Sequence, residues 1–449
     1  MSNQSNIQGS QNIVLQGVTD STITVNVNGT PQELERRLDS LLGLLDDFKA
    51  KQLQLEGKQY FIDSFNAENF DFLIEQLRNG RELPSELAEN LITDKNVWVK
   101  SLERELLRQG VSVGSQPQSI FEHYGWLIEV FLLKMNSPAG RAPTLRRLSF
   151  MAEAYQSSLR YLCYIQLSQL LPQKQKGLPS SITAFLKLEG DDHIKFDYLN
   201  LLLLCTEQLQ GQDNFMPEIE ELVEELTDSE TDLYSTAVFL TRQRDALLAG
   251  TIKEDDQLGA LLDQYLTGLV YWLRYIAFLA KYRLVSIKDI NLSYRLGTAK
   301  NFIHRYGELH GVYAEIMNDE DEDYKSHSVQ DVFTFNQSIL LLKDSSVKVS
   351  LQNLRNEVNY LSLSPLLIDQ SVFADKITQT PEIFYYTGRA NKGRKYVYDL
   401  YKNELRLNEE RKNPNKQLVV QKQNIKQHKL DELYDQLQQL FKPANRASV

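Results

Sequence analysis

The longest helical pattern in the chain runs from Leu145 to Leu171 without a Gly or Pro and stops at Pro172. Proline removes a helical hydrogen bond and clashes with the preceding turn, so it marks the end of this helix. Apolar residues at helical spacing also fill residues 96–110, 196–210, 219–227, 233–250 and 257–283. Helices bury their apolar faces against one another, so the pattern predicts a large helical bundle over residues 58–285.

The composition changes after residue 285. Residues 284–295, 338–346, 347–354 and 381–401 are rich in β-branched and aromatic residues and are bounded by turn residues, which is typical of strands. We therefore expect a smaller α+β region over residues 286–412. A polar helix or tail should follow over residues 413–449, with Leu430, Leu433, Leu437 and Leu440 on one face.

The segment Asn12–Gly29, NIVLQGVTDSTITVNVNG, precedes the helices and contains no Lys or Arg and a single acid, Asp20. Its two β-runs flank TDS, which has turn chemistry, so we expect a β-hairpin or β-arch within residues 1–29. The expected fold class is mainly α: an N-terminal β-hairpin or arch, a heptad helix, a large helical bundle and a smaller C-terminal α+β region.

A short heptad helix is expected over residues 30–57. The sequence Thr30-Pro31-Gln32-Glu33 is a capping box with proline at the first helical position. The apolar positions that follow alternate between spacings of four and three, which is typical of a coiled-coil seam. They are Leu34, Leu38, Leu41, Leu45 and Phe48.

Composition and motifs argue against several classes of function. With a net charge of −11 and a pI near 5.3, the chain as a whole does not favour polyanions. Cys163 and Cys205 lie in apolar helical patterns, and the sequence contains no phosphate-binding loop, dinucleotide fingerprint, serine-hydrolase motif or zinc motif. We expect no metal and no cofactor.

No signal peptide is recognised, and the longest apolar stretch contains Arg274 and Lys281, so we expect a cytoplasmic protein without a membrane span.

The N-terminal β-segment favours assembly between copies of the chain. High β-propensity, almost no charge, no proline and abundant Asn and Gln are typical of cross-β stacking, whereas natural sheet edges are usually blunted by Lys or Pro. We expect a dry face of Ile13, Leu15, Ile23, Val25 and Val27, with side-chain ladders from Gln16, Asn26 and Asn28. The alternative is that the hairpin pairs with a sheet of its own chain.

The stretch NIVLQG, Asn12–Gly17, resembles the short amyloid signalling motifs of bacterial immune proteins, including those likened to RHIM motifs. The resemblance implies an N-terminal tag ahead of an effector module. It also implies that the partner is the same chain or a protein that shares the motif. The expected function is a non-enzymatic interaction or adaptor protein of bacterial defence signalling.

Residues 136–285 resemble the HEPN-like helical domains of bacterial defence and signalling proteins, through GRAPTLRRLSFMAEA, FLTRQRDALLAG and YLTGLVYWLRYIAFLAKYRLV. In such domains the motif reads R-N-x-x-x-H-G. Here RDALLAG supplies Arg244 and Asp245, then Ala249 in the place of His, and Gly250. The resemblance therefore implies a scaffold or sensor that lacks the general acid/base.

Two other functions stay open. An HEPN-like ribonuclease would use Arg305 and His310, separated by four residues in RYGELH, as phosphate ligand and general acid/base. A nucleic-acid sensor would use the basic C-terminal region, where positive charges alternate with Tyr396, Tyr398 and Tyr401. Its candidate contacts are Arg389, Lys392, Arg394, Lys395 and Lys402.

Overall fold

The structure is a computed structural model that describes strands 12–18 and 21–26 and most of residues 97–441. Gaps within the second range are 112, 114–116, 138–139, 141, 174–177, 256, 294–300, 310–324, 330–336, 344–359, 374–380, 392, 404–415 and 423–427. The heptad helix predicted over residues 30–57, with its seam residues, and the helical patterns up to residue 96 lie outside the described residues.

The longest described helix begins after a capping residue, Thr144, and ends just before a proline, Pro172. The Thr144 hydroxyl accepts a hydrogen bond from the Arg147 amide and caps α8 (Leu145–Leu170), which passes into the 3₁₀ turn η2 (Leu171–Gln173). The other α-helices are α4 (Val97–Arg108), α5 (Pro117–Phe121), α6 (Trp126–Asn136), α9 (Ser180–Phe185), α10 (Tyr198–Leu209), α11 (Glu218–Thr227), α12 (Asp232–Leu248), α13 (Leu258–Tyr275) and α15 (His428–Leu440). The other 3₁₀ turns are η1 (Glu122–Tyr124), η3 (Gly190–Ile194), η4 (Ala277–Lys281) and η7 (Gln370–Val372). None of the helices described is both long and apolar enough to cross a bilayer.

The described strands form antiparallel sheets. β1 (Asn12–Val18) and β2 (Ser21–Asn26) pair with each other. The five-stranded sheet contains, in spatial order, β5 (Lys325–Val329), β4 (Asn301–Glu308), β3 (Arg283–Ser293), β6 (Ile339–Leu342) and β7 (Tyr360–Ser362). The four-stranded sheet contains β11 (Gln417–Gln421), β10 (Lys395–Leu400), β9 (Ile383–Ala390) and β8 (Leu367–Asp369). The expected hairpin within residues 381–401 is formed by β9 and β10.

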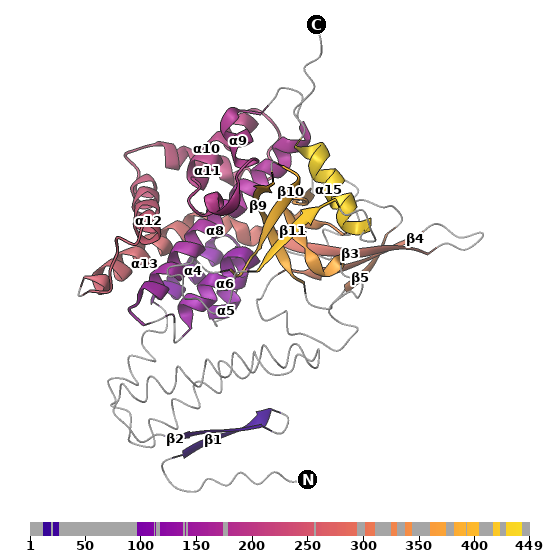
Figure 1. Ribbon diagram of the computed structural model, residues 1–449. Helices are drawn as coiled ribbons and strands as arrows, with labels where there is room; N and C mark the ends of the chain where they lie inside the picture. The colour runs from indigo at the N-terminus through magenta and orange to yellow at the C-terminus, as the bar shows by residue number, and fades with distance from the viewer. Residues whose placement is uncertain are drawn as a thin grey trace, which may run out of the picture.

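Helix α8 connects the helices to the sheets. Every residue from Leu148 to Leu167 is buried, and the helix contacts α6, α10, α12 and α13 as well as β7. The Tyr164 hydroxyl donates a hydrogen bond to the Tyr386 carbonyl of β9 over 2.5 Å, which ties α8 to the four-stranded sheet. Figure 1 shows most helices on one side and both larger sheets on the other, with α15 beside β10 and β11. One hydrophobic cluster runs from α4 to α15.

This shared core makes the expected fold class wrong. The two larger antiparallel sheets contribute to the same hydrophobic cluster as the helices, so the described chain is an α+β protein rather than a mainly α bundle with a smaller α+β region. The boundary expected at residue 285 falls inside β3. The boundary expected at residue 412 separates β11 from its partner β10, because Gln417–Gln421 is a sheet strand and not part of a polar helix.

A buried ion pair joins the two larger sheets. Lys288 Nζ on β3 lies 2.7 Å from Asp369 Oδ2 on β8, and both side chains are 1% exposed. Asp369 also accepts hydrogen bonds from the hydroxyls of Ser286 (2.8 Å) and Ser371 (2.6 Å). Burial by itself raises the pKa of the Asp369 carboxyl, but the Lys288 charge and these hydrogen bonds outweigh it, and the pKa lies below its ordinary value. The pair therefore stays ionised and fixes the packing of one sheet against the other.

Replacing Lys288 by methionine should lower the free energy of unfolding by about 3–5 kcal/mol, because the Asp369 carboxylate then stays buried without its counter-charge. The matched control is Lys416→Ala, which breaks the more exposed pair with Glu382 (2.5 Å) and should cost less than about 1 kcal/mol. Urea unfolding of both variants measures the difference. Similar losses in the two variants would contradict the role assigned to the buried pair.

Candidate functional site

The dry face expected of the N-terminal segment lies on the β1–β2 hairpin. The register places Ile13 opposite Val25 and Leu15 opposite Ile23. Residues two apart in a strand, and residues directly opposite each other in a pair of strands, belong to the same face of a sheet. The backbone register therefore groups these four residues on one face of the hairpin.

The expected ladder residues lie opposite other polar residues. Gln16 is opposite a threonine and Asn26 is opposite an asparagine. The remaining predicted assembly residues, Val27 and Asn28, lie outside the described residues.

The hairpin forms a sheet of its own. Among the strands that the structure describes, neither β1 nor β2 joins the four-stranded or the five-stranded sheet. The outer edge of each strand therefore has no strand partner within the described part of the chain. A lone two-stranded hairpin is marginally stable in water, whereas three or more strands with an apolar face are stable. Among the described strands, the hairpin therefore gains no stability from a third strand.

The three tyrosines of the basic C-terminal region do not form a surface for bases. Tyr396, Tyr398 and Tyr401 are no more than 2% exposed, so their rings belong to the core and are not available for stacking. The Arg389 guanidinium lies over the Phe441 ring, 5.1 Å from its centroid, and packs against the same core.

The other predicted nucleic-acid contacts lie around β10. Arg394 is exposed and Lys395 half-buried where β9 turns into β10. Lys402 follows β10, with its ammonium 5.8 Å from the centroid of the Tyr401 ring. Lys392 lies outside the described residues.

The predicted nuclease pair is not placed on a helix. Arg305 lies on β4, and its Nη1 is 3.3 Å from Asp289 Oδ2 on the neighbouring strand β3. His310 lies outside the described residues. The helical spacing that a catalytic Arg–His pair would need is therefore not formed at Arg305.

Arg244, which the HEPN-like resemblance singles out, is buried at the contact of α12 with α8. Its guanidinium donates hydrogen bonds to Gln156 on α8 and to Asp245, the latter over 2.6 Å from Nη2. The side chain is 3% exposed, so it connects two helices rather than facing solvent. Ala249 and Gly250 follow the end of α12.

The sequence reasoning also missed a third buried cation, after Lys288 and Arg244. Arg160 on α8 lies 4.2 Å from the centroid of the Tyr385 ring and 5.3 Å from that of Tyr198. Burial by itself lowers the pKa of Arg160. The electrostatic effect of Tyr385, Tyr198 and Glu153 is larger, so the pKa of Arg160 is raised. Burial also raises the pKa of the Glu153 carboxyl, which Arg160 partly counteracts. These groups join α8 to β9 and have almost no contact with solvent.

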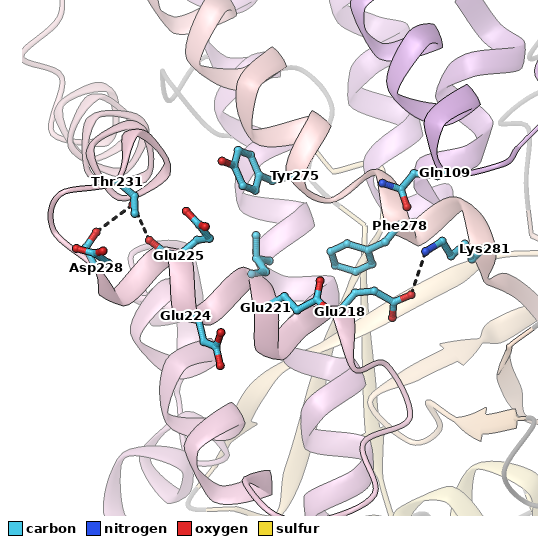
Figure 2. A pocket seen from close by; sticks show the side chains of 11 residues that line it. Gln109, Glu218, Glu221, Glu224, Glu225, Asp228, Thr231, Tyr275, Phe278 and Lys281 are labelled. Atoms are coloured by element: carbon cyan, nitrogen blue, oxygen red, sulfur yellow. Dashed lines mark hydrogen bonds and ion pairs between the residues drawn. The ribbon is translucent and has the colours of Figure 1, made fainter.

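The sequence reasoning also missed an acidic groove. It has a volume of about 510 Å³ and lies between α11, the end of α13 and η4, with Leu222, Tyr275 and Phe278 as its apolar wall. Figure 2 shows the carboxylates of α11 spaced along one side of this groove. They belong to Glu218, Glu221, Glu224 and Glu225, with Asp228 following the helix. Their spacing of three and four in EIEELVEELTD is visible in the sequence.

Among the residues that the structure describes, the acidic charge of the groove is compensated only at one end, by Lys281. Glu218 pairs with Lys281 (3.4 Å) and accepts a hydrogen bond from the Tyr282 hydroxyl (2.8 Å). Glu221, Glu224 and Glu225 make no ion pair within the described residues. A hydrogen bond with Tyr271, partial burial and the charge of Glu225 raise the pKa of Tyr275 to about 12. The groove therefore favours cationic groups over anions.

No metal centre accompanies the groove in the described part of the chain, because no cluster of three or more His, Cys, Asp or Glu residues there has the geometry to hold an ion. The chain matches no protein-family model, no curated protein and no solved structure. Function must therefore be argued from the chemistry of these surfaces.

Replacing Glu225 by glutamine should raise the free energy of unfolding by about 0.5–1.5 kcal/mol at low salt, because it relieves repulsion from Glu221 and Asp228 near the negative end of α11. The matched control is Glu207→Gln, near the end of α10, where no acid lies three or four residues away. Thermal unfolding at low and high salt measures both. A gain that is equal in the two variants, or that survives high salt, would contradict repulsion within the groove.

Proposed function

We propose that the chain is a non-enzymatic interaction protein that assembles with further copies of itself through the β1–β2 hairpin. The observation that carries the proposal is that β1 and β2 form a sheet of their own, with no third strand among the described residues. The register that groups Ile13, Leu15, Ile23 and Val25 on one face supports it, because two such faces can stack without trapping water.

The chemistry of the hairpin favours a second copy as the partner. An unblunted strand edge offers a row of backbone donors and acceptors, which an identical edge can pair. The hairpin sequence contains no Lys or Arg, and its one acid, Asp20, falls in the sequence between the two strands. Copies therefore meet through a nearly neutral segment, although the whole chain has a net charge of −11 and otherwise repels itself.

We extend the proposal to an adaptor role in bacterial defence signalling, in the cytoplasm, because NIVLQG resembles amyloid signalling motifs. In this role a protein that shares the motif is an additional partner, and assembly concentrates the folded body that each copy carries. The ribonuclease and nucleic-acid alternatives gain no comparable support, since Arg305 is on a strand and Tyr396, Tyr398 and Tyr401 are buried.

Val25→Lys should raise the concentration at which large assemblies form by about ten-fold or more, because an ammonium placed in a dry apolar face has no counter-charge. The matched control is Thr24→Lys, which adds the same charge to the adjacent position on the opposite face. Solvent screens that charge, so its effect should be several-fold smaller. Light scattering and thioflavin fluorescence over a concentration series measure both.

Thermal unfolding of the two variants shows whether the folded body is intact, and both should unfold at the temperature of the unmodified chain. If Val25→Lys assembles at the same concentration as the unmodified chain, the proposed dry face is wrong. If both lysine variants lose assembly equally, the two faces are not distinguished and the stacking of apolar faces is wrong.

A further inference from the structure

We propose that the acidic groove is one half of a two-fold contact between two copies of the folded body, in which Leu107 of each copy enters the groove of the other. The contact goes beyond the proposed function, because it involves neither β1 nor β2. It follows from an exposed apolar side chain, from the charges beside it and from its position next to the groove.

Leu107 is an apolar side chain that the fold leaves in solvent near the end of α4. It is 54% exposed, whereas Leu102 and Leu106 of the same helix are fully buried. A single exposed leucine is ordinary on a protein surface. The charges around Leu107 therefore decide which partner surface suits it.

Two arginines accompany Leu107 on α4. Arg104 lies one turn before it, is exposed, and makes no ion pair within the described residues. Arg108 is 68% exposed, and its Nη1 lies 3.1 Å from Glu105 Oε2, an oxygen that Arg274 Nε also approaches at 3.7 Å. One carboxylate therefore serves two arginines. We call Arg104, Leu107 and Arg108 the Leu107 knob, because they present an apolar side chain beside two positive charges.

The groove offers the complementary combination. Its apolar wall lies beside a row of carboxylates, of which Glu221, Glu224 and Glu225 are exposed and have no counter-charge among the described residues. Its volume of about 510 Å³ is within the range of pockets that enclose a ligand, roughly 300–1,000 Å³. The leucine of a knob can therefore pack on the wall while its arginines meet the carboxylates.

The knob lies beside the groove of its own chain but does not fill it. Gln109, which lines the groove, follows Leu107 by two residues, and its amide donates to the Glu105 carbonyl (3.0 Å) in continuation of α4. Side chains two apart on a helix do not face the same way, so Leu107 does not point into the groove. Figure 2 shows Gln109 at the same end of the groove as Lys281, with Glu225 nearer the other end. A surface that carries a knob and a groove side by side is self-complementary, as a two-fold interface requires.

The net charge of −11 does not prevent this contact. Charges farther apart than a Debye length, about 8 Å at physiological ionic strength, are largely screened from each other. The repulsion between whole bodies is therefore weak, whereas the arginines of the knob and the carboxylates of the groove lie within reach of each other. Charge complementarity of this kind selects the partner surface and its orientation.

Reciprocal charge reversal tests which surfaces meet. Arg104→Glu/Arg108→Glu makes the knob acidic, and Glu221→Lys/Glu225→Lys makes the groove basic. Each variant alone should dimerise at least about ten-fold more weakly than the natural chain, because like charges then oppose each other in both halves of the contact. A 1:1 mixture should recover the dimer to within about three-fold, because each knob then meets a groove of opposite charge. Sedimentation equilibrium measures the dissociation constants at physiological salt, below the concentration at which large assemblies form.

Two controls separate the contact from changes in net charge and from exposure alone. Lys187→Glu/Arg242→Glu reverses two exposed cations outside the knob and should dimerise as the natural chain does. Leu107→Asn should weaken the dimer by about ten-fold, because it removes the apolar side chain from the contact. Leu292→Asn, at a leucine that is 56% exposed on β3, should leave the dimer unchanged. Circular dichroism and thermal unfolding verify that every variant is folded.

The outcomes separate this inference from the proposed function, because the hairpin is the same in every variant. If the natural chain is monomeric at every concentration below the onset of large assemblies, the inference is wrong. It is also wrong if the folded reversal variants dimerise as the natural chain does, or if their mixture recovers no dimer. A chain that shows the expected dimer but never forms large assemblies would overturn the proposed function alone.

Discussion

The fold depends on α8, a helix that has almost no solvent-facing side. A helix buried all round is normally apolar, yet α8 also buries Ser149, Glu153, Gln156 and Arg160. Two of these groups contact other elements: the Gln156 side-chain oxygen accepts a hydrogen bond from Arg244 of α12, and the Arg160 guanidinium lies against the Tyr385 ring of β9. These contacts of the polar side chains of α8 therefore help to fix how α12 and the four-stranded sheet pack against it.

Tyrosines and one ion pair extend this coupling into the sheets. Tyr164 of α8 donates to the Tyr386 carbonyl, and the Tyr386 hydroxyl donates to the carbonyl of Leu186, beyond α9, over 2.8 Å. Lys288 and Asp369 then fix the five-stranded sheet on the four-stranded one. Buried charged groups and hydroxyls that have hydrogen-bond partners favour a single packing of the elements, because any other packing leaves these groups without a partner. Helices and sheets consequently form one cooperative body.

The parts of this architecture that the sequence predicts are those set by local chemistry. Pro172 ends the pattern of α8, and the strands of β9 and β10 are flanked by turn residues, so both were predicted near their observed bounds. The burial of Arg160 was not predictable, because a charge within a helical pattern ordinarily indicates the solvent face. β11 was missed for a related reason: a five-residue segment becomes a strand only because β10 offers an edge. The acidic face of α11 was visible in the spacing of its glutamates, but the groove depends on Tyr275 and Phe278 from other elements.

The body and the hairpin differ in where their polar groups find partners. The body pairs Lys288 with Asp369 and Arg244 with Gln156 inside its core, whereas the hairpin leaves its strand edges without a partner among the described strands. The measurement that tests this contrast most directly is amide hydrogen exchange of residues 12–26 in dilute and in assembled protein. We predict exchange slowed by about a hundred-fold or more in the assembled protein alone, with the exchange of α8 unchanged. Equal exchange of residues 12–26 in both samples would contradict the account, because the outer edges of β1 and β2 would then gain no strand partner on assembly.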